Sequence, residues 1–461
     1  DGRFANFVGA VDLERVGVFG HSAGGGAAIR VCLVDERCDA VLGFDPWVEP
    51  LPPRVLGVAA TRPALFMRSD EWRGTQNDAL LRGLAGRGES VTYWLGVEDT
   101  RQPVLAATRA VMTNRDPLHT NEETFYAALS PLLPASLGEF RSGAEEFYAT
   151  AYPALQSGTQ LRESARPLVE WLAAQGYAVV VATNPFFPRV AVEQRLAWAG
   201  LPVGEMPFAL VTTLETMHFS KPHQDYYEEI LARIGAAPGE AIMVGDDWTN
   251  DIVPAHRAGL HTYWIAPGDS APGPDAAPFG VGTLDEFFAW IQRAEGFDDL
   301  IARALEPAQI APRLNGGLAA LLGLAREIGP DAWTARPASG EWSPAEIFGH
   351  LGETERAVHR PRLVQTAQGD GPFFAASEPG TGTCSGDGWD AALAFYRERQ
   401  ITLDFLAGLA DDAWDRPAVH HRLGATTLLG MADHIVQHDR THIRQLRETL
   451  AHTQPGSSGV R

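Results

Sequence analysis

Cysteine and long apolar runs are both scarce in this 461-residue chain. Its three cysteines, Cys32, Cys38 and Cys384, form no C-x-x-C pair, so the sequence predicts neither a disulfide framework nor a four-cysteine zinc site. No stretch approaches about 18 consecutive apolar residues, and we expect no transmembrane helix. This cysteine usage favours a reducing cytoplasm as the location of the protein. The chain starts with Asp1 rather than Met, which indicates a processed chain or a fragment.

Positive charge is also scarce. The formal net charge is −21, which argues against sequence-independent binding to nucleic acid, since such binding needs clustered Lys and Arg. Of the 37 basic residues only one is a lysine, Lys221. A lone lysine is expected where a compact ammonium is required, with chance survival as the alternative. Apolar residues make up 45% and charged residues 21%, an ordinary globular composition, and the length suggests roughly two to four domains.

The order of apolar runs and turns divides the chain into three segments. Residues 1–98 and 99–293 alternate predicted strands with helices, which is typical of parallel α/β sheets. Residues 297–453 show four long amphipathic patterns and no strand, which predicts a four-helix bundle. Residues 454–461 are polar and rich in Gly and Ser, so we expect a disordered tail. The predicted fold class is therefore multidomain, with α/β regions followed by an all-α bundle.

The apolar periodicity predicts the individual elements. The predicted strands are 16–19, 40–44, 64–67, 91–97, 178–183, 209–213, 241–244 and 261–265. The predicted helices of the α/β regions are 24–34, 103–112, 122–129, 144–152, 161–175, 190–199, 224–234 and 284–293. The four bundle helices are expected at about 307–328, 343–368, 387–410 and 424–450. A capping box at Ser343 and Glu346, with Pro344 at the first helical position, marks the start of the second.

A serine motif stands in the first segment. Gly20-His21-Ser22-Ala23-Gly24 matches G-x-S-x-G between a predicted strand and a predicted helix, where the glycines allow a tight turn that exposes the Ser22 hydroxyl. Residues 10–97 resemble the platelet-activating-factor acetylhydrolase and dienelactone-hydrolase branch of the α/β-hydrolases, which implies Ser22 as nucleophile and Asp45 as the orienting acid. No histidine follows Val97 at the expected place, and almost no strand precedes Val16. We therefore expect a truncated sheet and little esterase activity.

Polar residues also gather at the strand ends of the second segment. Thr183, Lys221 and Asp246 follow predicted strands or open a predicted helix, and parallel sheets bind ligands at such positions. A hydroxyl, an ammonium and carboxylates together suit phosphate and Mg²⁺. The structural alternative is a solvated acidic turn beside a surface lysine.

These positions resemble the second, third and fourth motifs of the haloacid-dehalogenase-like (HAD) hydrolases, with residues 103–175 similar to the helical cap of that family. The resemblance implies that Thr183 binds the phosphoryl group and that Lys221 offsets its charge. It also implies that Asp246 holds Mg²⁺ with support from further carboxylates, namely Asp247 or Asp251.

The first motif of the HAD family is missing. That motif is Asp-x-Asp after the first strand, and no Asp-x-Asp precedes residue 103. The best alignment places Gly96 at the nucleophile and Glu98 at the acid/base, with residues 91–97 as a substitute first strand. Because glycine has no side chain to phosphorylate, we expect binding of phosphate or Mg²⁺ with poor turnover.

Histidines recur every four residues on the last predicted helix, at His434, His438 and His442. Residues i and i+4 share a helix face, so two such imidazoles can bind one metal ion. A third ligand from another helix, for which His350 is the candidate, would complete an open three-histidine site. A surface or core role for these histidines is the structural alternative. We expect the pair His420-His421, in the loop before this helix, to face solvent.

The third segment as a whole resembles the DinB-like bundles, which include metal-dependent thiol transferases. Trp342-Ser343-Pro344 ahead of His350-Leu351, and the run from His438 to Leu446, carry this resemblance over about 300–450. It implies His350, His438 and His442 as ligands of a divalent transition metal, Zn²⁺ or Ni²⁺ first, with Fe²⁺ and Mn²⁺ left open. His434 would then be a supporting or structural group. Open metal positions would hold water and a substrate thiolate.

Three functions follow from these patterns. The first is a divalent-metal-binding bundle, a thiol-dependent transferase or hydrolase, fused to an impaired HAD-like phosphohydrolase domain. The second is an active HAD-type phosphatase or hydrolase using Mg²⁺. The third is a non-catalytic relic fusion or binding module, so enzymatic activity itself stays open. We expect a small-molecule substrate, a phosphate ester or a thiol, no nucleic-acid or membrane partner, and a homodimer as an open alternative.

Overall fold

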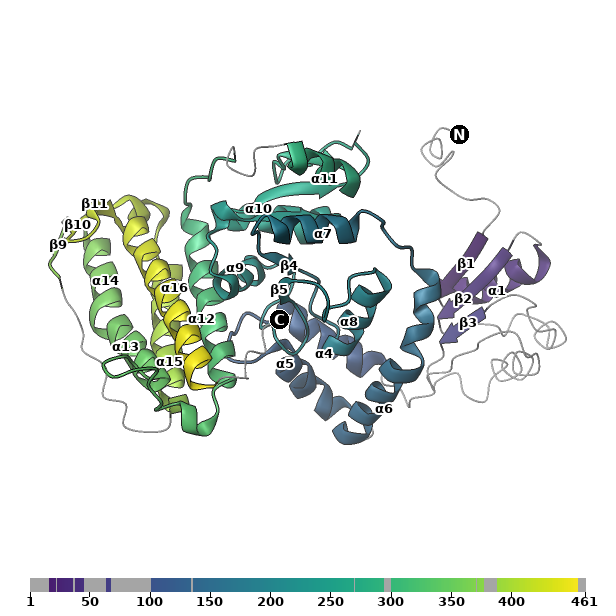
Figure 1. The fold of residues 1–461 in the computed structure, drawn as a ribbon, viewed down its shortest axis with the longest axis horizontal. Helices are drawn as coiled ribbons and strands as arrows, with labels where there is room; N and C mark the ends of the chain where they lie inside the picture. The colour runs from purple at the N-terminus through teal and green to yellow at the C-terminus, as the bar shows by residue number, and fades with distance from the viewer. Residues whose placement is uncertain are drawn as a thin grey trace. The chain divides into compact units, whose positions relative to one another are not determined.

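The computed structural model describes most of the chain (Figure 1). The described residues are 16–21, 23–35, 38–44, 64–67, 101–133, 136–268, 270–293, 300–369, 371–376 and 388–454. The chain divides into two compact units, one of residues 1–107 with 128–151 and one of residues 108–127 with 152–461. Among the described helices, none is both long enough and apolar enough to cross a membrane.

The first three strands form a parallel sheet in the order β1-β2-β3. They are β1 (Val16–His21), β2 (Cys38–Phe44) and β3 (Ala64–Met67). Helix α1 (Ala23–Val34) connects β1 to β2 as a parallel crossover, and it buries Ala28 and Ile29. These elements agree with the predicted strands and helix to within two residues at each end. The predicted strand 91–97 lies outside the described residues.

A disulfide joins Cys32 of α1 to Cys38 of β2, with the two Cα atoms 5.0 Å apart. The cysteine count and spacing did not predict this bond. It is one link between residues close in sequence rather than a framework, and the crossover brings the end of α1 back beside the start of β2. Cys384 lies outside the described residues.

Four helices precede the second α/β region. They are α4 (Arg101–Thr113), α5 (Asn121–Leu129), α6 (Leu137–Thr150) and α7 (Ala165–Ala174). Helix α6 begins seven residues before the predicted start at residue 144, because Ser136 and Glu139 form a capping box at its N-terminus. Helix α7 buries Leu168 against Tyr263 and Phe287, so it covers the α/β sheet.

Two short parallel sheets follow. Strand β4 (Val179–Val181) pairs with β5 (Phe208–Val211), and β6 (Ile242–Gly245) pairs with β7 (His261–Ile265), which pairs with β8 (Gly280–Gly282). The connecting helices are α8 (Arg189–Trp198), α9 (Gln224–Ile234), α10 (Val253–Ala258) and α11 (Leu284–Arg293). The sequence predicted the strands and their parallel direction. It placed β8 in a loop, since that strand is only Gly-Val-Gly.

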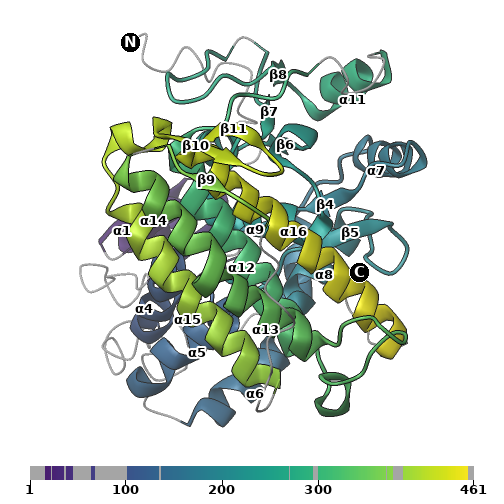
Figure 2. The same cartoon turned by 90° about the vertical axis from the view of Figure 1, so that its left-hand side faces the viewer.

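The last part of the chain is a helical bundle (Figure 2). Its helices are α12 (Ile310–Arg326), α13 (Pro344–Thr354), α14 (Arg360–Gln368), α15 (Gly388–Ala407) and α16 (Leu428–Thr453). A π-helical turn, residues 355–359, joins α13 to α14, so together they replace the single predicted helix 343–368. The predicted capping box forms, with Ser343 Oγ accepting from the Glu346 N–H. The core contains Leu321, Phe348, Phe395 and Leu446, all at most 1% exposed.

A small sheet at one end of the bundle contradicts the expectation that strands stop near residue 297. It has the order β11-β10-β9, with β9 (Phe373–Phe374), β10 (Pro417–His420) and β11 (Gly424–Thr427). Strands β10 and β11 form a hairpin that turns at Gly424, whose φ is 69°. Strands of two to four residues are too short to establish a recognisable alternation, which is why the pattern missed them.

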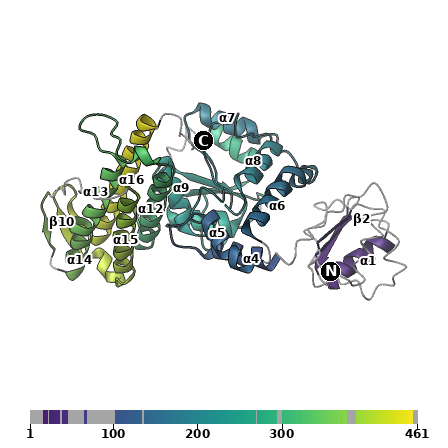
Figure 3. The same cartoon turned by 90° about the horizontal axis from the view of Figure 1, so that it is seen from below.

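Helices α9 and α12 join the α/β core to the bundle (Figure 3). The two backbones approach closely at Gly316, where a Cβ atom would lie 2.6 Å from the backbone nitrogen of Glu229. Ala319 of α12 belongs to the core around α9, and Ala232 of α9 belongs to the bundle core. The bundle and the α/β core therefore share one buried interface.

Candidate metal centre and phosphate site

Three histidine side chains converge inside the bundle. His350 comes from α13, and His438 and His442 lie one turn apart on α16. His438 Nε2 lies 3.3 Å from His350 Nε2 and 3.2 Å from His442 Nε2. One ligand atom from each of the three histidines lies within 4.8 Å of the others. The structure thus brings together the three residues that the DinB resemblance implied as ligands.

The protonation of this cluster suits a metal. His442 donates its Nδ1 hydrogen to Gln445 Oε1 over 2.8 Å, which leaves the Nε2 lone pair free. Burial, reinforced by the neighbouring imidazoles of His359 and His442, holds the pKa of His438 far below its usual range. Burial also lowers the pKa of His442. Neutral imidazoles are the form that binds a divalent ion.

The spacing also fits a metal. Zn²⁺ binds imidazole nitrogen at about 2.0–2.1 Å in tetrahedral sites, and two ligands of a tetrahedron at that radius stand about 3.3 Å apart. The observed Nε2 separations of 3.3 Å and 3.2 Å match this edge. The buried Nδ1 of His438 has no hydrogen-bond partner among the described residues. Three imidazole ligands would leave a fourth coordination position open.

A buried ion network connects the elements that carry the three converging histidines. Arg399 of α15 is fully buried and donates to both carboxylate oxygens of Glu355, at 2.9 Å and 3.0 Å. It also donates to both oxygens of Asp439, at 2.5 Å and 3.0 Å. Burial opposes its charge, but the carboxylates of Asp439 and Glu355 raise the pKa of Arg399. Glu355 follows α13 directly and Asp439 follows His438, so the network connects the two helices on which the three histidines lie.

Trp342 forms one wall of the histidine cluster. Its ring stacks on His442 with an interplanar angle of 5° and a centroid distance of 6.0 Å. Its centroid lies 4.7 Å from that of His350. An indole against two of the converging imidazoles restricts their rotation and covers the cluster on that side.

A second set of histidines lies beside the first, on the π-helical turn before α14, on strand β10 and on α16. His359 is buried and its ring lies 4.9 Å from that of His438, while His434 lies 5.0 Å from His420. Burial lowers the pKa of His359 to about 3 and that of His420 to about 4. His434 therefore contacts these rings and is not one of the three converging residues.

Sequence reasoning was wrong about His420 and missed His359. His420 is 1% exposed rather than solvent-facing, because the unpredicted strand β10 turns its side chain inward to Arg362 Nη1, at 3.0 Å. His359 follows His350 by nine residues, which places it on the opposite face of a regular α-helix. The π-helical turn adds an extra residue per turn between them and changes that face.

Lys221 and Asp251 form a buried ion pair in the α/β core. Lys221 Nζ lies 2.6 Å from Asp251 Oδ1, and both side chains are at most 8% exposed. The other oxygen of Asp251 accepts the Asp247 N–H at 3.2 Å. Gly245 permits this approach, since a Cβ there would lie 2.5 Å from Asp251 Oδ2. Asp251 thus pairs with Lys221 through one oxygen and accepts a hydrogen bond from the backbone after β6 through the other.

The other predicted phosphate-site residues each have contacts of their own. Asp247 caps the following helical turn, and hydrogen bonds from the Asn250 side chain and then from backbone N–H groups lower its pKa. Asp246 is exposed at the end of β6. Thr183, after β4, has its carbonyl bound by Tyr226 and Thr212 hydroxyls at 2.7 Å and 2.8 Å.

Several predicted site residues lie outside the described part of the chain. They are Ser22, Asp45, Gly96 and Glu98.

Three protein families match the sequence, and the first two of the matched ranges overlap. Residues 1–119 match platelet-activating factor acetylhydrolase isoform II, residues 68–259 match haloacid dehalogenase-like hydrolase, and residues 313–446 match the DinB superfamily. The chain is a composite. Its DinB-like part contains all three converging histidines, and its HAD-like part contains Lys221 and Asp251. The composite resemblance and the mixed fold class predicted from the sequence are both confirmed.

Curated relatives match the HAD-like part. Phosphoserine phosphatase from Thermus thermophilus is 33% identical over 117 residues, 25% of this chain and 44% of the relative. Pyrophosphatase PpaX from Bacillus cereus is 35% identical over 104 residues, 23% of this chain and 45% of the relative. The chain therefore spans less than half the length of these two relatives.

Solved structures resemble two of the parts. YfiT from Bacillus subtilis, described as a probable metal-dependent hydrolase with an unusual four-helix bundle topology, covers 32% of this chain and 90% of its own, with 14% identity and a TM-score of 0.29. A HAD phosphatase from Thermococcus onnurineus covers 47% of this chain and 81% of its own, with 20% identity and a TM-score of 0.28.

Proposed function

We propose that the DinB-like bundle binds one divalent transition metal ion through His350, His438 and His442. The observation that carries this proposal is the convergence of these three imidazoles, with His438 Nε2 at the edge length of a tetrahedral site from the Nε2 atoms of both His350 and His442. The depressed pKa of His438 and the hydrogen bond from His442 to Gln445 support it, because both keep the ligand nitrogens unprotonated. Imidazole ligands suit Zn²⁺ and Ni²⁺, and these are the ions we propose.

The bound ion would supply Lewis acidity and lower the pKa of a water or thiol at its open position. The chain's own residues would supply the rest. Gln445 orients the His442 ring, and Arg399 fixes the spacing of the ligand helices through Glu355 and Asp439. Trp342 excludes water from one side. These features suit a metal-dependent hydrolase or a thiol-dependent transferase acting on a small molecule.

Cobalt binding tests this function directly. Co²⁺ replaces Zn²⁺ in tetrahedral sites and reports its ligand geometry through visible absorption. We expect wild type to take up Co²⁺ with a tetrahedral spectrum, and His438→Ala to lose it. His452→Ala is the matched control, because His452 is an exposed histidine on the same helix, outside the cluster. Equal spectra for wild type and His438→Ala would refute the proposed site.

A second function is favoured by the buried Lys221–Asp251 pair in the HAD-like part. We propose that Lys221, Thr183 and Asp246 bind a phosphate ester with Mg²⁺, supported by Asp247 and Asp251. The curated relatives named as phosphatases support this substrate class. Turnover is expected to be poor, because Gly96 stands where the family alignment places the nucleophile. Orthovanadate binding that needs Mg²⁺ and is lost in Lys221→Ala would support the site.

The remaining alternative is a relic fusion without catalysis. Absence of both Co²⁺ uptake and vanadate binding would favour it. A cytoplasmic location stays a proposal, supported by the low cysteine content and opposed by the Cys32–Cys38 disulfide. A homodimer likewise stays a proposal.

A further inference from the structure

Basic side chains gather at the end of the bundle where the small sheet β11-β10-β9 packs against α14 and α16 (Figure 2). We name as the basic cluster Arg362 of α14, His434 of α16 and the consecutive residues His420, His421 and Arg422. Arg362 Nη1 lies 3.0 Å from His420 Nε2. The centre of the His420 ring lies 5.0 Å from that of His434 and 4.5 Å from that of His421. Elements far apart in the sequence thus bring these groups together.

Arg362 and Arg422 lack the acidic partner that a neighbouring arginine has. Arg360, two residues before Arg362 on α14, binds Glu398 at 2.6 Å. Among the residues that the structure describes, no carboxylate lies within ion-pair distance of Arg362 or Arg422. Basic residues are scarce in this chain, so two guanidinium groups at one place without a described counter-charge are suited to an external anion.

The electrostatic environment of His434 reflects the positive charge of the cluster. Burial lowers the pKa of His434, and the charges of Arg422 and Arg362 lower it further. The Asp433 carboxylate opposes this effect, but it already faces Arg313 at 3.3 Å. The cluster therefore has a local positive potential in a chain whose formal net charge is −21.

The Arg362 guanidinium is held in place by its own neighbours. Its Nη1 donates to His420 Nε2 at 3.0 Å, and its Nη2 donates to the Ala375 carbonyl at 2.8 Å. Its Cζ lies 5.5 Å from the centre of the Phe374 ring. A guanidinium has five N–H donors, and these two hydrogen bonds leave the others available. An anion would gain charge-assisted hydrogen bonds here without the cost of ordering this side chain.

The same contacts make the basic cluster unsuitable for a metal ion. The Arg362 N–H occupies the lone pair of His420 Nε2 that a metal would need, and the guanidinium charge repels a cation. Among the described residues, the histidines whose ligand atoms converge as a group of three are His350, His438 and His442. The two sets of histidines therefore favour ligands of opposite charge.

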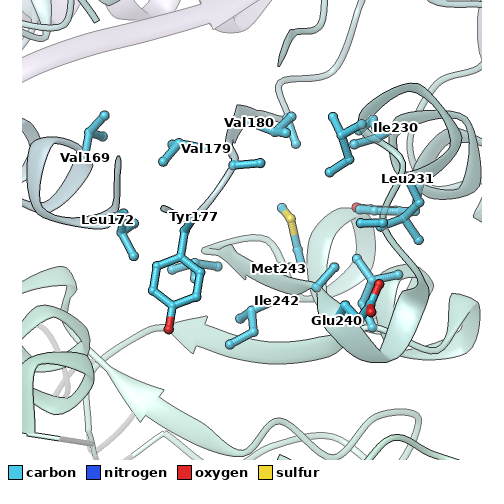
Figure 4. Close-up of a pocket in the computed structure, with 18 of the residues that line it drawn as sticks. Val169, Leu172, Tyr177, Val179, Val180, Ile230, Leu231, Glu240, Ile242 and Met243 are labelled. Carbon is cyan, nitrogen blue, oxygen red and sulfur yellow. The ribbon is translucent and has the colours of Figure 1, made fainter. Parts of the chain in front are cut away.

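An apolar cavity between β4 and β6 has a different character from the basic cluster (Figure 4). Its volume is about 380 Å³, and Val179 and Met243 are among the residues that line it. Glu240 is the only charged residue among the described residues of this lining. A carboxylate in an apolar wall repels an anion, so this cavity does not compete with the basic cluster for one.

We propose that the basic cluster binds the anionic group, a phosphate or a carboxylate, of the small molecule that reaches the three-histidine site. The anion site itself stands on the geometry of the cluster, whereas this substrate class rests on the proposed metal function. The net charge of −21 repels a polyanion such as a nucleic acid, which favours a small anion.

The spacing of the two sites sets the size of this molecule. His434 precedes His438 by one turn of α16, about 5.4 Å along the helix. The ring of His359 stands between them, 4.9 Å from His438 and 6.3 Å from His434. The anionic group and the reacting group would therefore stand roughly one to two helical turns apart, about 5–11 Å.

Arginine labelling of the full-length, metal-free protein tests the anion site. Phenylglyoxal modifies accessible guanidinium groups, and peptide mass spectrometry resolves each arginine. We expect inorganic phosphate, acetate or both to slow the labelling of Arg362 and Arg422 by about tenfold, and the more effective anion identifies the group that is bound. Arg397, exposed on α15 outside the cluster, is the internal control and should be labelled at an unchanged rate.

Removal of one arginine should abolish the protection of the other. Arg422→Gln changes an exposed side chain, so the fold should be kept, and Arg362 should then be labelled equally fast with and without the anion. Arg397→Gln should leave the protection intact. No slowing by either anion, or equal slowing at Arg397, would overturn the anion site. Protection without any Co²⁺ uptake would refute the metal function and keep the anion site.

A pair of thiol probes tests the substrate class in Co²⁺-loaded protein. Mercaptohexanoate and mercaptohexanol have the same chain length, and only the first carries an anionic group. We expect the visible spectrum of wild type to respond to the acid at about tenfold lower concentration than to the alcohol. Arg422→Gln should remove this preference, and Arg397→Gln should keep it. Equal responses to both probes in wild type would overturn the assignment of an anionic substrate.

Discussion

Asp439, the residue that follows His438 on α16, accepts a 2.5 Å hydrogen bond from Arg399. The same guanidinium holds Glu355, so one buried charge fixes two carboxylates on the helices that carry the three converging histidines. The cluster geometry therefore depends on a network that does not itself contact the proposed metal position.

Replacing Arg399 with Met should destabilise the bundle strongly. The change leaves Glu355 and Asp439 buried without a counter-charge, and breaking a buried pair typically costs about 3–5 kcal/mol. Urea unfolding followed by tryptophan fluorescence measures the loss. Arg397→Met is the control, because Arg397 is exposed on the same helix. A loss for Arg399→Met no larger than for the control would contradict the role of the network.

Glu228 should make stability fall as pH rises. Burial in the α9–α12 interface raises its pKa to about 7, and Arg313 and Arg440 offset the burial only in part. Since the folded-state pKa lies above the ordinary value of about 4.5, folding favours the protonated form. The cost of burying the carboxylate thus appears between pH 4.5 and 7.

The Glu228→Gln variant isolates this titration. Its free energy of unfolding relative to wild type should rise between pH 4.5 and 7.5, by at most about 3 kcal/mol. Unfolding curves at pH 4.5, 6 and 7.5 measure the change, and Glu163→Gln, at an exposed position, should show none. A difference between Glu228→Gln and wild type that is the same at all three pH values would show that Glu228 does not titrate in this range.

Adding a methyl group at Gly316 should disrupt the joint between α9 and α12. A Cβ there would meet the backbone of Glu228 and Glu229 at 2.6–2.7 Å, and backbone cannot give way as a flexible side chain can. We expect Gly316→Ala to lose about 1–3 kcal/mol by overpacking. Gly317→Ala is the neighbouring control, with its nearest contact at 3.6 Å. Similar thermal unfolding of the two variants would argue against the close approach.

Gln445 should tune metal affinity without holding the metal. Gln445→Leu removes the acceptor that orients His442, and loss of such a partner typically weakens metal binding about 10- to 100-fold. Gln437→Leu, at an exposed position of the same helix, is the control. Competition with a chromophoric chelator measures both affinities. Unchanged affinity in Gln445→Leu would exclude this orienting role.

Local sequence patterns predicted most of the fold. Helix α9 and strand β7 begin and end where expected, because their periodicity and flanking turns are unambiguous over a few residues. The i, i+4 spacing of His438 and His442 likewise predicted a shared face, and His350 joined them through the family resemblance.

The rest depends on contacts that no local pattern encodes. His359 reaches His438 through a π-helical turn, and His420 is buried by a hairpin whose strands are too short to recognise. The close approach at Gly316 and the network around Arg399 arise only when distant helices meet. Contacts between residues this far apart in the sequence can be identified only in the folded structure.

The metal content of the purified protein tests the central claim most directly. Elemental analysis would be made on wild type, His438→Ala and the exposed-site control His452→Ala after equal exposure to Zn²⁺ and gel filtration. The three-histidine site predicts about one ion per chain in wild type and in the control, and none in His438→Ala. An ion retained by His438→Ala, or none in wild type, would contradict the account.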